Sequence, residues 1–203
     1  MTDAFRNAYY HLDLLVGFSA PVFFFLLYKT GRIDRLLWRF FWVGAALGAA
    51  WEIPIFYLSA ESTTLPIIVW NRPLPLHYSA FMLSHTLWDG LLFALGILLI
   101  RGLFRGTRLD SFRWPELLVL IAWGQVSELL VELSSTLNDG WSYIEYPWNP
   151  VIFHFNGYNI TWLLQAVWLA ASIVYYFLLV NRPGRFIFSL LTHRPRRDNI
   201  SLL

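Results

Sequence analysis

Hydrophobic residues along the chain fall into five long runs separated by shorter polar stretches. Because a helix rises about 1.5 Å per residue, about 20 apolar residues cross the roughly 30 Å hydrocarbon core of a bilayer. The runs predict an all-α bundle of five transmembrane helices with spans at 12–28, 37–58, 81–100, 114–133 and 160–180. We expect one integral membrane domain that covers residues 1–203.

The composition supports a membrane protein and excludes several kinds of functional site. Of the 203 residues, 57% are hydrophobic and 14% are charged, and the charges cluster between the apolar runs. The chain has no cysteine, which excludes disulfides, thiolate ligands and thiol nucleophiles. The net charge of +2 is too small and too dispersed to indicate nucleic acid as a partner.

The distribution of basic residues predicts the orientation of the chain in the membrane. Arg6 and Arg72 stand alone on one side. The other side carries Lys29, Arg32, Arg35, Arg39, Arg101, Arg105, Arg108, Arg113, Arg182, Arg185, Arg194, Arg196 and Arg197. Since cytoplasmic connections are enriched in basic residues, we expect the N-terminus outside or in a lumen and the C-terminal tail in the cytoplasm. The pattern fits a bacterial inner membrane and the endoplasmic reticulum equally well.

The two connections expected on the outer side are long and rich in Trp, Tyr, Pro and Asn. They cover residues 59–80 and 134–158. Indole and phenol rings favour the membrane interface, so these connections either form a lid over the bundle or contribute to an ordinary aromatic belt.

The second run contains a carboxylic acid, Glu52, in the sequence Gly-Ala-Ala-Trp-Glu-Ile-Pro. An ionisable group at the bilayer centre costs several kcal/mol, so it needs a partner or a task. The preceding small residues Gly44, Ala45, Gly48 and Ala49 let another helix approach closely. We therefore expect Glu52 to lie inside the bundle, either as a catalytic group or as a structural hydrogen-bond donor.

Polar groups also occur in the later runs at helical spacing. His85 and Asp89 are four residues apart, which places them on one face as a candidate proton-handling pair. The fourth run contains three polar residues at spacings of three and four, which fall on one helical face, and the fifth run opens with two more. These residues are Gln125, Glu128 and Glu132, followed by Asn159 and Trp162. If these faces meet, they form an internal cavity lined by polar groups, which is what we predict.

Such a cavity would have the chemistry to move protons on a hydrocarbon. Buried carboxyl groups remain partly protonated and can serve as acids near neutral pH. A tryptophan face stabilises a developing carbocation through cation–π attraction. Protonation of a double bond or an epoxide followed by proton removal needs no cofactor. The five histidines form no closely spaced pair of the kind that binds metal, so no metal is expected.

Short motifs in the last two runs resemble a known family. Gly124-Gln125 is followed by a carboxylate, an Asp-Gly loop and Asn159-Ile-Thr-Trp162, an order that resembles the emopamil-binding sterol Δ8-Δ7 isomerases of the EXPERA superfamily. The resemblance implies that Glu52 belongs to the acid–base machinery and that Trp162 stabilises the cation. The family carries a histidine one turn before its second-helix glutamate, where this chain has Gly48.

A second resemblance points to the same chemistry. Trp51-Glu52 followed by Trp88-Asp89 is similar to the membrane-bound terpene cyclases of meroterpenoid pathways, which protonate an epoxide or alkene with buried carboxyls.

Together these observations predict an intramembrane, cofactor-independent isomerase or cyclase of a sterol-like or terpenoid substrate. Its expected catalytic residues are Glu52, Asp89, His85 and Glu128, and its expected substrate-binding residues are Trp51, Trp88, Gln125, Glu132, Asn159 and Trp162. The expected partners are a lipophilic isoprenoid and membrane lipids, and homodimerisation stays open. The alternative is a lipid- or sterol-binding or trafficking protein of the EXPERA type that holds a ligand without transforming it. A proton-coupled carrier is a third reading, which the absence of internal repeats disfavours.

Overall fold

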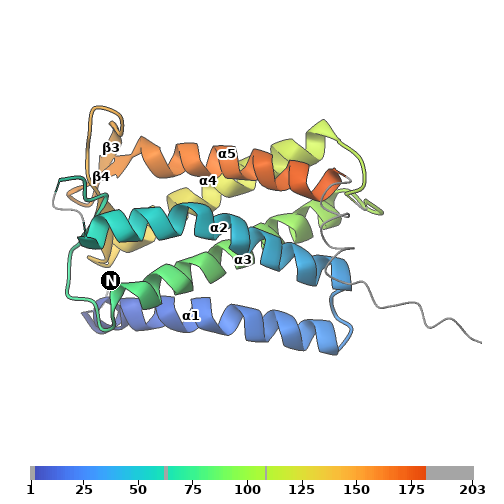
Figure 1. The fold of residues 1–203 in the computed structure, drawn as a ribbon, viewed down its shortest axis with the longest axis horizontal. Coiled ribbons are helices and arrows are strands. Elements are labelled where there is room, and N and C mark those ends of the chain that lie inside the picture. Colours follow the sequence, from blue (N-terminus) through green and yellow to red (C-terminus); the bar gives the residue numbers. More distant parts are fainter. Residues whose placement is uncertain (1–2, 62–63, 108, 182–203) are drawn as a thin grey trace, which may run out of the picture.

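The computed structural model describes residues 3–61, 64–107 and 109–181. Its main elements are five long helices, and two short two-stranded sheets lie between them (Figure 1). In chain order the elements are α1 (Asp3–Lys29), α2 (Arg35–Glu61), β1 (Ile68–Trp70), α3 (Tyr78–Leu103), α4 (Trp114–Leu137), β2 (Trp141–Tyr143), β3 (Val151–Phe155), β4 (Tyr158–Thr161) and α5 (Trp162–Val180).

All five helices are long and apolar enough to cross a membrane, which confirms the predicted five-helix bundle. Large apolar side chains such as Leu15, Val22, Leu118 and Leu130 are exposed on the outside of the bundle, where a bilayer would cover them. The chain is therefore a multi-pass membrane protein.

The helix boundaries differ most from the sequence prediction at the N-terminus. Helix α1 starts nine residues before the expected position 12, because Tyr9 and Tyr10 are buried at the end of the bundle where α1 begins. Helix α5 starts at Trp162 rather than at Ile160, since the residues before it pair as strand β4. Helices α2, α3 and α4 extend their predicted spans by a few residues.

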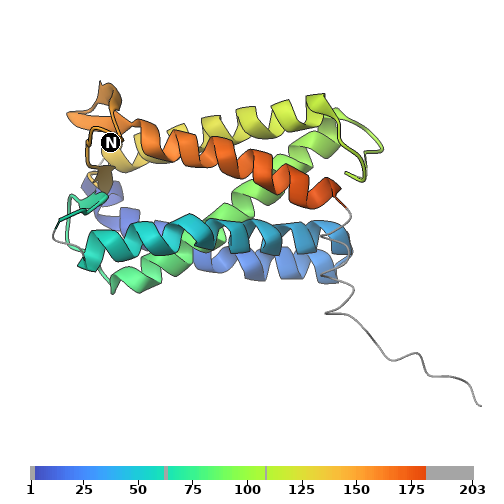
Figure 2. The ribbon, with the colours of Figure 1, turned by 45° about the horizontal axis from the view of Figure 1, so that its top comes forward.

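Helix α3 is the central element, and it packs against α1, α2 and α4. In Figure 2 it crosses diagonally between the pair α1/α2 and the pair α4/α5. Glycine allows the close approaches: a β-carbon on Gly17 of α1 would lie 2.8 Å from the Ser84 carbonyl oxygen of α3. A β-carbon on Gly44 of α2 would lie 2.8 Å from the β-carbon of Phe93, so the predicted small-residue interface of α2 is confirmed.

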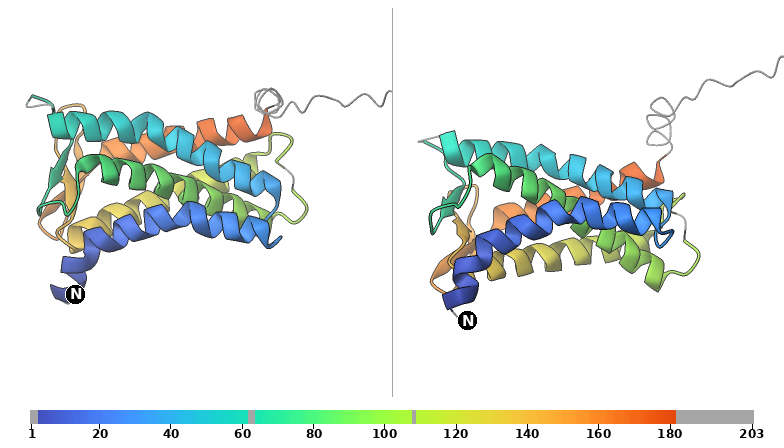
Figure 3. Two further views of the ribbon diagram at one scale, coloured as in Figure 1. Left: turned by 60° about the horizontal axis from the view of Figure 1, so that its bottom comes forward. Right: turned by 90° about the horizontal axis from the view of Figure 1, so that it is seen from below.

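The two long connections that we expect on the outer side pair with each other at one end of the bundle. Strand β1 of the first connection runs antiparallel to β2 of the second, with Trp70 opposite Trp141, and β3 pairs with β4 in a separate hairpin. These strands lie at the same end as the N-terminus (Figure 3). We refer to the strands β1 to β4 as the outer cap. Since Trp141 of this cap is 2% exposed, the cap closes the end of the bundle as the predicted lid would.

Side chains from distant parts of the sequence attach the outer cap to α1. The Tyr10 hydroxyl donates to the Gly140 carbonyl at 2.6 Å. The Arg72 guanidinium donates to the carbonyl oxygens of Asn138 at 2.8 Å and Asp139 at 3.1 Å, and also to that of Arg6. Backbone carbonyls that the turn leaves without partners are thereby satisfied.

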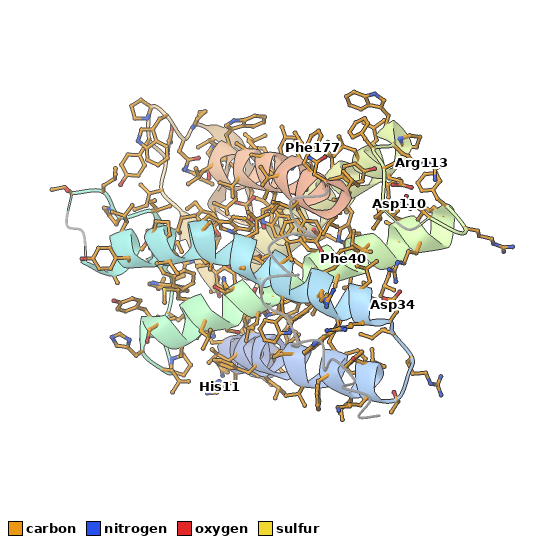
Figure 4. All side chains as sticks on the ribbon, turned by 45° about the vertical axis from the view of Figure 1, so that its right-hand side comes forward. His11, Asp34, Phe40, Asp110, Arg113 and Phe177 are labelled. Carbon is orange, nitrogen blue, oxygen red and sulfur yellow. The ribbon has the colours of Figure 1, made fainter. Side chains whose placement is uncertain are left out.

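The opposite end of the bundle carries most of the described basic residues and the anchored carboxylate of Asp34. Asp34 caps α2 by accepting from the Leu37 amide at 2.7 Å, and it pairs with Arg101 at 3.1 Å. Asp34 and Arg113 both lie at this end (Figure 4). The described residues do not include Arg108 or the basic residues of the tail, Arg182, Arg185, Arg194, Arg196 and Arg197.

Candidate functional site

A cavity of about 350 Å³ lies in the half of the bundle next to the outer cap. All five helices and strand β2 contribute to its wall. Its volume is at the lower end of the roughly 300–1,000 Å³ that is typical of small-molecule sites. Much of the wall is aromatic or aliphatic, and the polar groups are concentrated on α1 to α4.

Three carboxyl groups predicted from the sequence line this one cavity. Glu52 comes from α2, Asp89 from α3 and Glu128 from α4, and the three are 7%, 5% and 4% exposed. They lie close enough to one another for their charges to interact. Acidic groups from three helices thus meet in one largely apolar chamber. The acid–base enzyme predicted from the sequence requires this arrangement.

The three carboxyls differ in their partners. One oxygen of Glu52 accepts from the Trp51 indole at 3.1 Å, and the other lies 3.8 Å from Nδ1 of His85. Asp89 Oδ2 and Glu128 Oε1 have no hydrogen-bond partner among the described residues. Buried polar atoms in native proteins are nearly always satisfied, so these two oxygens are exceptions on carboxyls that line the cavity, and Asp89 Oδ2 packs beside Gly48 of α2.

His85 is joined to a residue that the sequence analysis did not select. Its Nε2 lies 3.1 Å from Oδ2 of Asp13 on α1, so the predicted pairing of His85 with Asp89 is replaced by contacts with Asp13 and Glu52. The spacing of four residues does put His85 and Asp89 on one face of α3, but His85 finds its partners on the neighbouring helices α1 and α2. Asp13 also lines the cavity. A carboxylate inside the first apolar run was the signal that could have identified it.

Four tryptophans supply the aromatic part of the wall. They are Trp88, Trp123, Trp141 and Trp168, of which only Trp88 was predicted. Trp141 lies with its ring centroid 4.9 Å from that of His85. Trp168 stacks on Phe93 with a centroid separation of 5.0 Å. Such indole faces attract a cation within about 6 Å of the ring.

Tyr143 adds a phenol from the outer cap to the wall. Burial raises the pKa of Tyr143 well above its usual range, and the neighbouring Glu128, Glu52 and Glu132 carboxyls add to this effect. The Tyr143 phenol is therefore neutral and keeps its proton as a hydrogen-bond donor.

Three of the predicted substrate-binding residues pack behind the cavity rather than lining it. Trp51 packs edge-on against Trp168 and donates to Glu52. Glu132 accepts from the side-chain amide of Gln165 at 3.4 Å, and the Gln125 side chain donates to the Gln165 carbonyl at 3.0 Å. Trp51 therefore packs between α2 and α5, and the bonds of Gln125 and Glu132 join α4 to α5.

The motif Asn159-Ile-Thr-Trp162 does not reach the cavity lining either. Asn159 lies in strand β4 opposite His154, and Trp162 is 50% exposed at the start of α5. The residue that caps α5 is Asn149, which is fully buried and accepts from the Leu163 amide at 2.7 Å. The roles that the family resemblance assigned to Asn159 and Trp162 have no counterpart in this geometry, because β4 delays the start of the helix.

One side of the cavity has an apolar mouth between α1 and α4. Phe5 and Leu12 of α1 and Leu130 of α4 line the cavity and are also 43%, 37% and 60% exposed. Phe5, Leu12 and Leu130 all lie on helices that are long and apolar enough to cross a membrane.

The fold and the cavity define a class: a five-helix integral membrane protein with an acidic, tryptophan-lined internal chamber. Within the described residues, no three His, Asp or Glu side chains are arranged to hold a metal ion. Comparisons with protein-family models, with curated proteins and with solved structures find no match for this chain.

Proposed function

We propose that this protein is an intramembrane acid–base isomerase or cyclase that acts on an isoprenoid double bond or epoxide through a carbocation and without a cofactor. The observation that carries the proposal is the meeting of Glu52, Asp89 and Glu128, from three helices, in one cavity walled by tryptophans.

The chemistry balances with the groups present. Asp89 gives its proton to one carbon of a double bond, the π electrons form the new C–H bond, and the neighbouring carbon becomes cationic. Glu52 then removes a proton from an adjacent carbon, and the electrons of that C–H bond form the new double bond. With an epoxide, the proton goes to oxygen, the C–O bond breaks, and a neighbouring double bond attacks the cation and leaves a new cationic carbon. Glu52 removes a proton beside that carbon, and the electrons of the C–H bond form the final double bond. No oxidant or reductant is consumed.

The partners of the carboxyls support this division of roles. An ionised carboxylate without a donor in an apolar cavity costs several kcal/mol, which favours the protonated form of Asp89 and Glu128, the form that a general acid needs. Glu52 has an indole donor and a nearby imidazole, both of which stabilise an anion. Pairs of carboxyls in such contrasting surroundings are typical of acid and base partners.

Three further features support a lipid-soluble substrate. The cavity mouth at Phe5, Leu12 and Leu130 faces the bilayer, so a hydrocarbon enters without crossing water. The indole faces of the wall stabilise a cation that carries no hydrogen-bonding group. The resemblance of Trp51-Glu52 and Trp88-Asp89 to the meroterpenoid cyclases, and of the chain to the EXPERA isomerases, points to the same reaction type.

Deuterium incorporation tests the proposal without knowledge of the natural substrate. Purified protein in detergent or vesicles is incubated in D2O with a linear prenyl alkene, its terminal epoxide and a Δ8 sterol, and the products are analysed by mass spectrometry. We expect a product with deuterium bound to carbon from at least one probe. Glu52→Gln should abolish this product, whereas Glu145→Gln, at an exposed loop carboxyl, should leave it unchanged.

Two results would redirect the proposal. Full turnover by a folded Glu52→Gln variant would remove the acid–base mechanism. Saturable binding of a probe to the wild-type protein, with no deuterium in any product, would establish instead the alternative function of a lipid- or sterol-binding protein.

We also propose that the N-terminus and the outer cap face the outside or a lumen. Of the described basic residues, only Arg6 and Arg72 lie at the end of the outer cap, and the others are at the opposite end. A membrane-impermeant maleimide should label a Glu145→Cys variant in intact cells or sealed vesicles and should label Asp110→Cys only after the membrane is opened. The reverse pattern would invert the orientation.

A further inference from the structure

We infer that Asp13 is a positioning residue that holds His85 so that the imidazole can take up the proton that Glu52 removes in the proposed reaction. The inference rests on the proposed function and adds a fourth acidic residue to it. Asp13 lies on α1, 72 positions before His85 in the sequence.

The geometry places His85 between two carboxyl groups from different helices. Its Nε2 lies 3.1 Å from Asp13 Oδ2, which is a hydrogen-bond distance. Its Nδ1 lies 3.8 Å from Glu52 Oε2, which is too long for a hydrogen bond but close enough for a proton to pass after a small movement. The imidazole therefore spans the distance from α1 to α2.

The chemistry of the contact with Asp13 fixes which nitrogen carries the proton. With Asp13 as a carboxylate, which only accepts hydrogen bonds, the Nε2 that faces it carries the hydrogen. In the neutral imidazole, Nδ1 then presents a lone pair toward Glu52. When Glu52 has taken a proton from the substrate, it faces an acceptor.

Packing keeps both partners in this orientation. The His85 ring contacts Phe56 edge-on, with centroids 5.2 Å apart, and lies 4.9 Å from the ring of Trp141. The backbone carbonyl of Asp13 accepts from the Trp88 indole at 3.0 Å and from the Ser84 hydroxyl at 3.3 Å. Both donors are on α3, the helix that carries His85. Asp13 is thus docked on α3 independently of its carboxylate.

This arrangement carries the removed proton away from Glu52. Asp89 protonates the substrate, Glu52 removes a proton, and His85 takes that proton at Nδ1 to become an imidazolium held by Asp13. The imidazolium then releases its proton while Asp89 takes one up. Glu52, His85 and Asp89 then regain their starting states, and no proton is gained or lost.

Nitrogen-15 NMR of the ring nitrogens tests the positioning role directly and needs no substrate. The His85 signals are assigned by their loss in His85→Gln. We expect Asp13→Ala to shift the His85 Nε2 signal and to mix the two neutral tautomers, Asp13→Glu to retain the wild-type pattern, and Asp110→Ala to change nothing. Asp110 is an exposed matched control at the other end of the bundle (Figure 4).

Turnover in the deuterium assay provides the second readout. Asp13→Ala should lower the rate on the order of 100-fold, as expected for a misplaced catalytic group, with little change in KM. Asp13→Glu should restore a large part of it. If Asp13→Ala leaves the His85 signals unchanged, the inference is overturned, whatever happens to the rate. If the signals shift but the wild-type protein turns over no probe, the positioning contact stands and the proposed function fails.

Discussion

Asp89 occupies the space that the missing side chain of Gly48 leaves on α2. A β-carbon at position 48 would lie 2.6 Å from the β-carbon of Asp89, a distance that real side chains do not adopt. Helix α3 can therefore approach α2 closely only because position 48 is glycine. The residue that distinguishes this chain from the isomerase family at this position is thus the one that makes room for a cavity carboxyl.

This contact predicts that Gly48→Ala both destabilises the protein and impairs the site. The added methyl group forces α3 away from α2, and overpacking of this kind costs about 1–3 kcal/mol in free energy of unfolding. We expect a lower midpoint of thermal unfolding in detergent and a loss of turnover. Gly102→Ala is the matched control: a β-carbon there meets nothing within 4 Å, so the helix should be unaffected or gain about 0.4–1 kcal/mol.

Asp34 predicts a pH-dependent contribution to stability at the opposite end of the bundle. Burial acts to raise the pKa of Asp34, but the Leu37 amide and the Arg101 guanidinium outweigh it and hold the pKa below its usual value. A lowered pKa stabilises the fold above the unfolded-state pKa, and this stabilisation is lost as the pH falls through the folded-state value. Removal of the helix cap in Asp34→Ala should cost about 0.5–2 kcal/mol at neutral pH.

The difference in unfolding free energy between the wild-type protein and Asp34→Ala should therefore shrink as the pH is lowered below about 4, the ordinary pKa of an aspartate. Denaturant titrations at a series of pH values measure this difference. A difference that stays constant down to strongly acidic pH would mean that the Asp34 charge does not contribute.

The apolar mouth between α1 and α4 predicts contact with lipid chains. Because the chain has no cysteine, single-cysteine variants carry a fluorescent label at one chosen position only. Labels at Leu12→Cys and Leu130→Cys should be quenched by lipids with brominated acyl chains and hardly by iodide in the water. A label at Glu145→Cys, on an exposed loop of the outer connection, should show the opposite preference. Strong iodide quenching at position 130 would show that the mouth opens to water.

Sequence reasoning identified the acids of the cavity better than their partners. Glu52, Asp89 and Glu128 stood out because a carboxyl in a membrane helix is expensive, and all three line the cavity. The partnership of His85 with Asp13 was missed, since helical spacing relates only residues of one helix. Asn159 and Trp162 were placed at the site by a short motif, and the strand that holds Asn159 moved them away from it.

By itself, the sequence determined that the chain crosses a membrane five times and that acidic groups are kept among apolar residues, because hydropathy and helical periodicity are local properties. Only the tertiary structure decided that α3 lies between the other helices, that Trp141 of the outer cap closes the chamber, and that Asp13 faces His85. These contacts depend on how glycines let one helix approach another and on how the outer connections pair, and neither is encoded in the spacing of residues within a single span.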